Sequence, residues 1–442
     1  MKNENIKILN NKIIKIFFIL ITILFNLKIK SNLKLNGFSF KAHNKIYNNL
    51  KKNNRKFKYT SLKNLIKQLK KDSIFRRPKY LIFIDFYTNP FCNDINAYLL
   101  FKYYIKTKKK NAIYVTNSES DLYKTLLKKN KTKNIIPVNS TSNFYEELYP
   151  YLLNSKIIVN SYIDLNIQQI VSNVNYLKYL FITHAIGYFK TKIIAPQFDA
   201  LKEYKRNIIV SSPFEYEFYK KKLKYKDEYM HKAGLPRYDR FNSIKRNKSE
   251  KKCILVSFTY RKYSNIIYNN SLYKKNLEKL LNNISLMSFL KRKKIDLIYI
   301  QHHYDFFRKR PFNPNDFKYV KYRNQSYLSH YIEQCSLFIT DFSTISFDFM
   351  FLNKPVLFYL IDLKDKINFE EKEYMKYDKN KELYFENSFS EQEPLIKKIK
   401  DYVNHDFKLK SGLKKKYKSM FYYRTNITKR IIHIINKIIS KK

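Results

Sequence analysis

Short apolar runs alternate with amphipathic segments along most of the chain, beginning near Tyr80. YLIFIDFY, NAIYVT, NIIPVN, KIIVNS and YLFITH have the length and composition of buried strands, and the last of them ends at His184. Apolar residues at helical spacing fill the segments between them, as in NDINAYLLFKYYIK and DLYKTLLKK. Strand-length apolar runs that alternate with helices are typical of βαβ units around a parallel sheet. The pattern therefore predicts a first α/β domain.

The alternation restarts at Cys253 with the strand CILVSFTYR. A long helix is expected over 272–290, followed by the strands IDLIYIQHH and FKYVKY, a helix near Tyr327 to Gln334, the strand LFITD, a further helix and the strand PVLFYL. A last helical stretch, Leu413 to Ile439, is expected to pack back on the first domain. We predict an N-terminal segment and two doubly wound, Rossmann-like domains, covering residues 1–71, 72–245 and 246–442.

The N-terminal segment has a different pattern. Lysines flank an apolar run from Ile16 to Phe25, which is shorter than the roughly 20 residues that a membrane-spanning helix needs. No small-residue cleavage site follows the run, so a signal peptide is not indicated. Residues 13–27 fit a short span with snorkelling lysines, an interfacial helix, or a buried helix of the fold. We expect the region before about Lys71 to hold the protein at the cytoplasmic face of the plasma membrane, on anionic lipid.

Composition narrows the class of protein. The chain has 442 residues, of which 44% are hydrophobic and 17% aromatic, enough for a core. Its formal net charge of +52 points to nucleic acid, anionic lipid or a phosphorylated substrate as partner. A bias toward Lys, Asn, Ile and Tyr also explains much of that charge, because lysines are spread over the whole chain. The charge alone does not select a partner.

Scarce glycine and cysteine exclude several kinds of site. Only four glycines are present, so a GxGxxG fingerprint or a P-loop is impossible. The three cysteines form no CxxC pair, which indicates neither a zinc site nor a disulfide framework and favours a reducing compartment. We expect no metal site built from cysteines, and any bound phosphate must be held by helix ends and side chains.

Three polar clusters follow predicted strands, where open α/β sheets bind their ligands. The first is THAIGYFK, in which His184 has the right kind of side chain for a general base near neutral pH. The second is QHHYDFF, where only one of His302 and His303 is expected to face a cleft, because side chains alternate along a strand. A lone histidine at either place is also compatible with a structural or surface role.

The third cluster is LFITDFSTISFDF. Asp341 closes a strand, and Ser343 and Thr344 are expected at the N-cap and first turn of the next helix. Hydroxyls and unpaired N–H groups at a helix N-terminus bind anions, although the same residues also serve as simple caps.

The third cluster carries a family resemblance. ITDFSTISFDFMFLNKPVLFYLIDLKD closely resembles the signature of the CDP-glycerol glycerophosphotransferases, the teichoic-acid polymerases and primases, whose pattern is roughly S/T-D-Y/F-S-S/T-x-x-F-D-Y/F, then K-P, an apolar strand and D. The matching positions are Asp341, Ser343, Thr344, Phe347, Asp348, Lys354, Pro355 and Asp362.

Other segments resemble the family's motifs in the same order, over about Tyr80 to Ile435. THAIGYFK stands where the family has H-G-T-P-L-K, although Ala185 and Ile186 depart from that pattern. AGLPRYDRF resembles G-x-P-R-x-D, ILVSFTYR resembles A-P-T-W/Y-R, and IQHHYD replaces K-L-H-P. YYRTNITKRI resembles the closing segment without its acid. The candidate residues carried over are His184, Lys190, Arg237, Arg261, His302 (favoured over His303) and Arg430.

The resemblance implies a peripheral membrane enzyme with a GT-B fold and an active site between its two domains. Such enzymes move glycerol phosphate from CDP-glycerol to a hydroxyl of a lipid-linked acceptor and release CMP. His184 is then the expected base, and Ser343, Thr344 and His302 are expected to stabilise the donor phosphates. The other expected substrate contacts are Asp341, Arg261, Arg237, Lys190, His303 and Arg430. No cofactor is implied, and a divalent-ion requirement is left open.

Two alternative functions stay open. A CDP-ribitol phosphotransferase or a glycosyltransferase of surface polysaccharide would use the same architecture. A basic nucleic-acid-binding protein would use lysines interleaved with Tyr and Phe, but no compact recognition motif is present. We expect no nucleic acid partner.

Overall fold

The structure is a computed structural model that describes residues 62–85, 95–108, 111–138, 144–186, 201, 205–243, 252–261, 265–302, 305, 317–323, 327–362 and 387–440. All of them belong to one compact unit, Lys58–Lys442. Several predictions fall outside these ranges, namely the apolar run Ile16–Phe25 and the candidate site residues Lys190 and His303.

The first sheet has seven strands in the order β3-β2-β1-β4-β5-β6-β7, and its paired strands run parallel. Its strands are β1 (Tyr80–Ile84), β2 (Ala112–Asn117), β3 (Ile135–Val138), β4 (Ser155–Asn160), β5 (Lys178–Phe181), β6 (Asn207–Val210) and β7 (Met230–Lys232). The associated helices are α3 (Leu62–Asp72), α4 (Asn96–Lys108), α5 (Asp121–Lys128), α6 (Phe144–Leu153), α7 (Leu165–Asn173), α9 (Pro213–Lys221), α10 (Arg237–Ser243) and α20 (Ile427–Ser440).

The second sheet has six strands in the order β10-β9-β8-β11-β12-β13, again with parallel pairs. Its strands are β8 (Cys253–Val256), β9 (Asp296–Ile300), β10 (Val320–Arg323), β11 (Leu337–Thr340), β12 (Val356–Tyr359) and β13 (Ser388–Phe389). The helices around it are α11 (Asn265–Asn270), α12 (Leu272–Leu281), α13 (Ile284–Arg292), α15 (Leu328–Gln334), α16 (Ser346–Phe351), α18 (Gln392–Asn404) and α19 (Ser411–Ser419).

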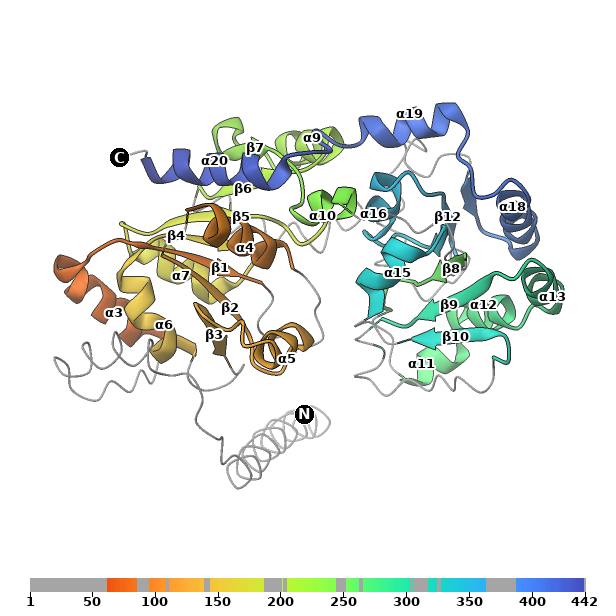
Figure 1. Ribbon diagram of the computed structural model, residues 1–442, viewed down its shortest axis with the longest axis horizontal. Helices are drawn as coiled ribbons and strands as arrows, with labels where there is room; N and C mark the ends of the chain where they lie inside the picture. Colours follow the sequence, from red (N-terminus) through yellow and green to blue (C-terminus); the bar gives the residue numbers. More distant parts are fainter. Residues whose placement is uncertain are drawn as a thin grey trace, which may run out of the picture. The chain divides into compact units, whose positions relative to one another are not determined.

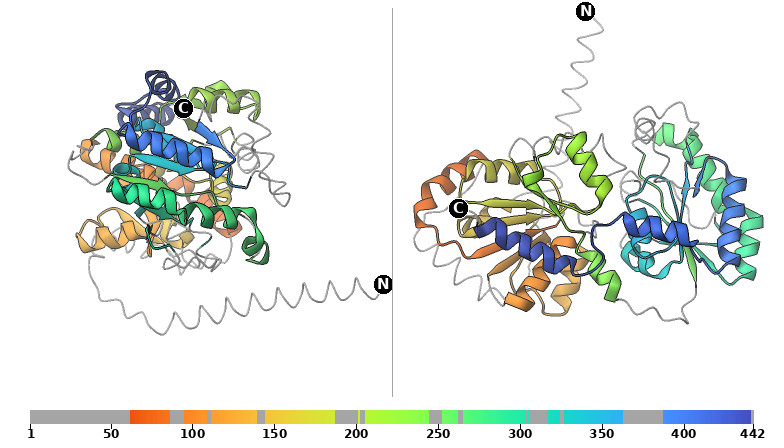
Figure 2. Two further views of the ribbon diagram at one scale, coloured as in Figure 1. Left: turned by 90° about the vertical axis from the view of Figure 1, so that its right-hand side faces the viewer. Right: turned by 90° about the horizontal axis from the view of Figure 1, so that it is seen from above.

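Helices cover both faces of each sheet (Figures 1 and 2). Alternate residues of β1 enter different cores, since Phe83 belongs to the cluster that includes α4 and α20, and Ile82 to the cluster that includes α3, α6 and α7. Strands buried on both faces read as continuous apolar runs, which is why they were recognisable in the sequence. Strand order reverses between β1 and β4 and between β8 and β11, so both sheets are doubly wound. The predicted α/β class is confirmed.

Two predicted long helices are divided in the structure. The stretch 272–290 forms α12 and α13, because the Asn283 side chain accepts a hydrogen bond from Leu286 N at 2.8 Å and caps a new helix. The stretch Leu413–Ile439 forms α19 and α20. Between them the guanidinium of Arg424 packs 4.4 Å from the centre of the Phe351 ring, a contact that a continuous helix pattern does not anticipate.

The final helix packs on the first sheet. α20 contacts α4, β4 and β5 (Figure 1), and its buried isoleucines include Ile431 and Ile435. None of the helices in the described ranges is long and apolar enough to cross a membrane.

Candidate active site

The carboxyl ends of β8 and β11 lie side by side at the switch point of the second sheet. The segment from Ser257 to Arg261 follows β8, and the segment from Asp341 onward follows β11. Open α/β sheets bind ligands at this kind of position, because the chain leaves the two strands in opposite directions and opens a crevice. The strongest sequence motif therefore lies where the topology favours a ligand.

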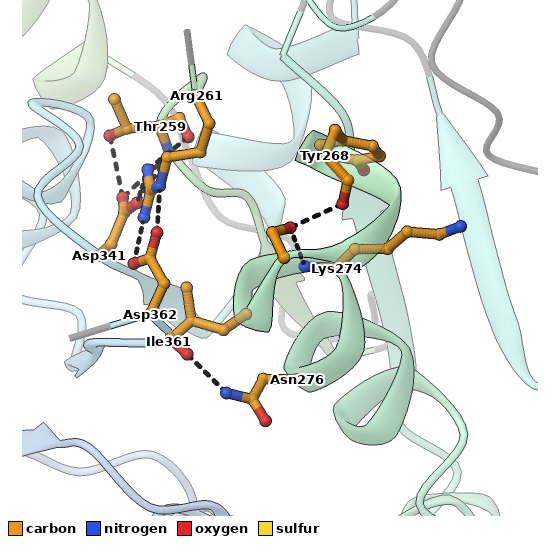
Figure 3. Close-up of polar contacts among 9 residues, drawn as sticks. Thr259, Arg261, Tyr268, Lys274, Asn276, Asp341, Ile361 and Asp362 are labelled. Atoms are coloured by element: carbon orange, nitrogen blue, oxygen red, sulfur yellow. Dashed lines mark hydrogen bonds and ion pairs between the residues drawn. The ribbon is translucent and has the colours of Figure 1, made fainter. Parts of the chain in front are cut away.

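Arg261 holds this strand end together (Figure 3). Its guanidinium is fully buried, donates through Nε and Nη2 to both oxygens of Asp362 at 2.7 and 2.8 Å, and donates through Nη1 to Asp341 at 2.8 Å. Nη1 also donates to the carbonyl of Thr259 at 2.7 Å. Since four interactions already engage it, Arg261 acts here as an anchor between β8, β11 and the end of β12. Its predicted contact with substrate stays a prediction.

Asp341 is equally buried and joins the two loops of the switch point. Its carboxylate accepts hydrogen bonds from Thr259 N at 2.9 and 3.1 Å and from Thr259 Oγ1 at 2.9 Å (Figure 3). Together with Arg261, these bonds occupy both carboxylate oxygens. Asp341 therefore ties the loops after β8 and β11 together, and its predicted contact with substrate stays a prediction.

Ser343 and Thr344 do not cap the helix, which corrects the sequence-based expectation. α16 begins at Ser346, and its N-cap is Ile345, without a side-chain cap. Ser343 instead forms a turn, because its Oγ accepts from Ile345 N at 3.4 Å and its carbonyl accepts from Ser346 N at 3.1 Å. The hydroxyl residues thus lie one turn before the helix, where local side-chain to backbone bonding competes with helix formation.

Asp348 anchors the other end of this motif. It is buried on α16 and accepts from Arg237 Nε at 3.0 Å and Nη2 at 2.9 Å. Burial raises the pKa of the Asp348 carboxyl, and the neighbouring Arg237 guanidinium opposes that shift. The segment 341–348 is therefore fixed at both ends by arginine–aspartate pairs, and Ser343 and Thr344 lie between the two pairs.

His184 lies beyond the end of its strand. β5 ends at Phe181, and Thr183 closes a tight turn by donating from Oγ1 to Ala185 O at 2.6 Å. This turn shortens the predicted strand and leaves the His184 side chain exposed. Arg237 Nη1 donates to the His184 carbonyl. The structure thus connects the candidate base to the end of the 341–348 segment through one arginine.

His302 follows β9 and is half-buried, with its ring centre 5.8 Å from that of Tyr260. Tyr260 belongs to the loop after β8, so His302 lies beside the switch point, and its role in stabilising phosphate stays a prediction. The pairing of His302 with Tyr260 was not anticipated from the sequence.

The G-x-P-R-x-D segment connects α10 to the start of α20. Asp239 caps α20 by accepting from Ile427 N at 3.1 Å and Thr428 N at 2.7 Å. Gly234 permits the close approach, because a Cβ there would lie 2.9 Å from Ile427 Cδ1. Arg430 is exposed on α20 over the Tyr423 ring, 3.9 Å from its centre. The substrate role of Arg430 stays a prediction.

Asn96 was missed by the sequence analysis. It opens α4, is fully buried, and its amide lies within 3.5 Å of the carbonyls of Thr183 and His184. An asparagine near a helix start resembles an ordinary cap, so no signal in a single sequence marks it. The described residues contain no group of three or more His, Cys, Asp or Glu placed to hold a metal ion.

Comparison with known proteins identifies a family and similar folds. The family model described as CDP-Glycerol:Poly(glycerophosphate) glycerophosphotransferase matches residues 70–437. The chain is 24% identical over 407 residues to the minor teichoic acid biosynthesis protein GgaB of Bacillus subtilis (strain 168), covering 84% of this chain and 41% of that protein. The chain thus spans about two fifths of the length of this relative.

Two solved structures share the fold at low sequence identity. The wall teichoic acid polymerase TagF has a TM-score of 0.57 at 16% identity, with 87% of this chain and 99% of that chain covered. The S. aureus MnaA–UDP co-structure has a TM-score of 0.51 at 12% identity, with 81% and 96% covered. These similarities concern the fold alone and confirm the GT-B-like arrangement of two parallel sheets.

Proposed function

Because the chain belongs to the CDP-glycerol:poly(glycerophosphate) glycerophosphotransferase family, we propose that it moves glycerol phosphate from CDP-glycerol to a hydroxyl of a membrane-linked acceptor and releases CMP. The observation that carries the proposal is the family match over 70–437. The two arginine anchors support it, because they hold the family's signature segment at the switch point of the second sheet. The product would be a teichoic-acid-like or other surface polymer.

The chemistry needs a base and a stabilised phosphate. The acceptor hydroxyl attacks the phosphorus that carries glycerol, its proton passes to the imidazole of His184, and the bond from that phosphorus to the CMP oxygen breaks. Ser343, Thr344 and His302 would hold the phosphate oxygens as charge moves to CMP. Lys190 and His303 are further candidate contacts.

A donor panel tests the proposed reaction. Purified protein and a membrane extract would be incubated with CDP-glycerol, CDP-ribitol and UDP-sugars, and released CMP and UDP would be quantified. We expect CMP release and a glycerol phosphate product with CDP-glycerol. CMP release with CDP-ribitol alone would assign another polyol, and UDP release would assign a glycosyltransferase.

Ser343 and Thr344 should determine donor affinity. Each lost hydrogen bond to a charged phosphate costs about 1.5–3 kcal/mol, so replacing both hydroxyl residues with alanine should raise the Kd for CDP-glycerol at least about tenfold. Isothermal titration would measure the Kd, and thermal unfolding would check the fold.

Ser346→Ala is the matched control. Its hydroxyl lies in the same turn and donates to Ser343 O at 2.7 Å, but it is fully buried. Its loss should lower stability by about 1 kcal/mol and leave the donor Kd unchanged. If the double variant also kept its donor Kd and only melted earlier, the two hydroxyls would have a structural role alone.

We further propose that the region before about Lys71 attaches the enzyme to the cytoplasmic face of the plasma membrane. Its lysines and the apolar run Ile16–Phe25 support this, since each lysine near an anionic leaflet contributes about 1 kcal/mol. Removing residues 1–61, a cut that leaves α3 and its buried Leu65 and Leu69 in place, should abolish sedimentation with anionic vesicles at physiological salt and retain CDP-glycerol binding. A truncated protein that still sediments would place the membrane contact elsewhere.

A further inference from the structure

We propose that Asn96 and Arg237 are positioning residues for His184, and that Arg237 couples His184 to the segment carrying Ser343 and Thr344. The inference rests on the proposed function for its kinetic part and on the geometry alone for its structural part. It concerns two residues that hold the backbone of the candidate base rather than its side chain.

The side chain of Asn96 is buried and lies close to three backbone groups. Its Nδ2 lies 3.5 Å from Thr183 O and 3.4 Å from His184 O, and its Oδ1 accepts from Arg237 N at 3.2 Å. Asp85 fixes the start of α4, since its carboxylate accepts from Ala97 N at 2.9 Å and from Tyr98 N at 3.0 Å. Asp85 therefore holds the helix start that carries Asn96.

Arg237 uses the three nitrogens of its guanidinium on two partners. Nη1 donates to His184 O, whereas Nε and Nη2 donate to Asp348 at 3.0 and 2.9 Å. The planar guanidinium can bridge the two partners at once, which a single ammonium group cannot. The position of His184 is consequently tied to that of α16, whose first turn follows Ser343 and Thr344.

This geometry assigns Arg237 a different role from a phosphate ligand. Mutating an arginine that binds phosphate weakens the enzyme's affinity for the donor, whereas mutating a positioning arginine lowers the rate at saturating substrate. Displacing a reacting group by about 1 Å costs on the order of 10²-fold in rate. We therefore expect Arg237→Lys and Asn96→Ala to lower kcat on the order of 10²-fold. The Kd for CDP-glycerol should stay unchanged, because lysine keeps a cation beside Asp348 and Asn96→Ala leaves the Arg237–Asp348 pair in place.

Arg240→Lys is the matched control. It makes the same substitution on the same helix, α10, where Arg240 pairs with Glu333 of α15 instead of the His184 turn. It should retain wild-type kcat. The acidic limb of the kcat pH profile should lie at the same pH in Arg237→Lys as in the wild type, since the base itself is present.

Hydrogen–deuterium exchange of the peptide covering 183–186 tests the structural part without substrate. Loss of one hydrogen bond should accelerate exchange there by about tenfold in Asn96→Ala and Arg237→Lys, with Arg240→Lys unchanged. Unchanged exchange in both variants would overturn the positioning role. So would faster exchange with wild-type kcat, or a raised donor Kd with unaltered kcat.

The two proposals fail separately. A wild type that releases no CMP from CDP-glycerol defeats the proposed function, and the exchange measurement still decides whether Asn96 and Arg237 hold the turn. A wild type that does release CMP, with variants equal to it in exchange and kcat, defeats the positioning role alone.

Discussion

His184→Ala is expected to abolish transfer while the protein stays folded and binds donor. General base catalysis contributes about 10²–10⁴-fold, so the rate at saturating substrates should fall at least about 10²-fold. The fold should survive because the side chain is exposed, and because Asn96 and Arg237 bind the His184 carbonyl, which alanine retains. CMP release and CDP-glycerol titration would measure the two quantities.

His433→Ala provides a control on an exposed histidine of α20, just outside the motif that contains Arg430. It should match the wild type in rate and stability. A His184→Ala variant that kept more than roughly a tenth of the wild-type rate, where a base predicts a loss of ~10²-fold or more, would show that another group accepts the proton.

The fold was largely predictable because its strands are buried on both faces. Runs such as NAIYVT and PVLFYL have no polar face that would interrupt the apolar pattern of a strand. The structure has strands in both. Element ends were less predictable. Asn283 divides the helix predicted over 272–290, and Thr183 ends β5 before His184, because a single side chain supplies an alternative backbone partner in each case.

The signature segment stood out in the sequence, but the contacts of its residues did not. Asp341 and Asp348 stood out in a motif, yet Arg261 and Arg237, their partners, lie 80 and 111 positions away in sequence. A pattern that suggests phosphate-binding arginines is equally consistent with arginines that hold carboxylates, since both ligands accept the same bidentate donors. The fold shows that both arginines hold aspartates, which the sequence alone does not reveal.

Arg261→Ala is therefore expected to destabilise the protein strongly, before any effect on donor binding. The substitution leaves Asp341 and Asp362 with side chains at most 5% exposed and without their cation. Removing one partner of a buried ion pair typically lowers the free energy of unfolding by about 3–5 kcal/mol. The substitution also removes the contacts that join the ends of β8, β11 and β12. Chemical denaturation with a linear extrapolation would measure the loss.

Two further variants test whether Arg261 acts as a buried anchor. Arg261→Lys keeps the charge but cannot make a two-armed contact with Asp362 and also reach Asp341, so its stability should lie between those of Arg261→Ala and the wild type. Lys220→Ala removes half of an exposed pair with Asp227, with side chains about half exposed, and should be close to neutral, because exposed pairs contribute little. If Arg261→Ala instead kept wild-type stability and lost donor affinity, the guanidinium would leave its acids to contact phosphate. The anchors of the 341–348 segment would then be part of the binding event.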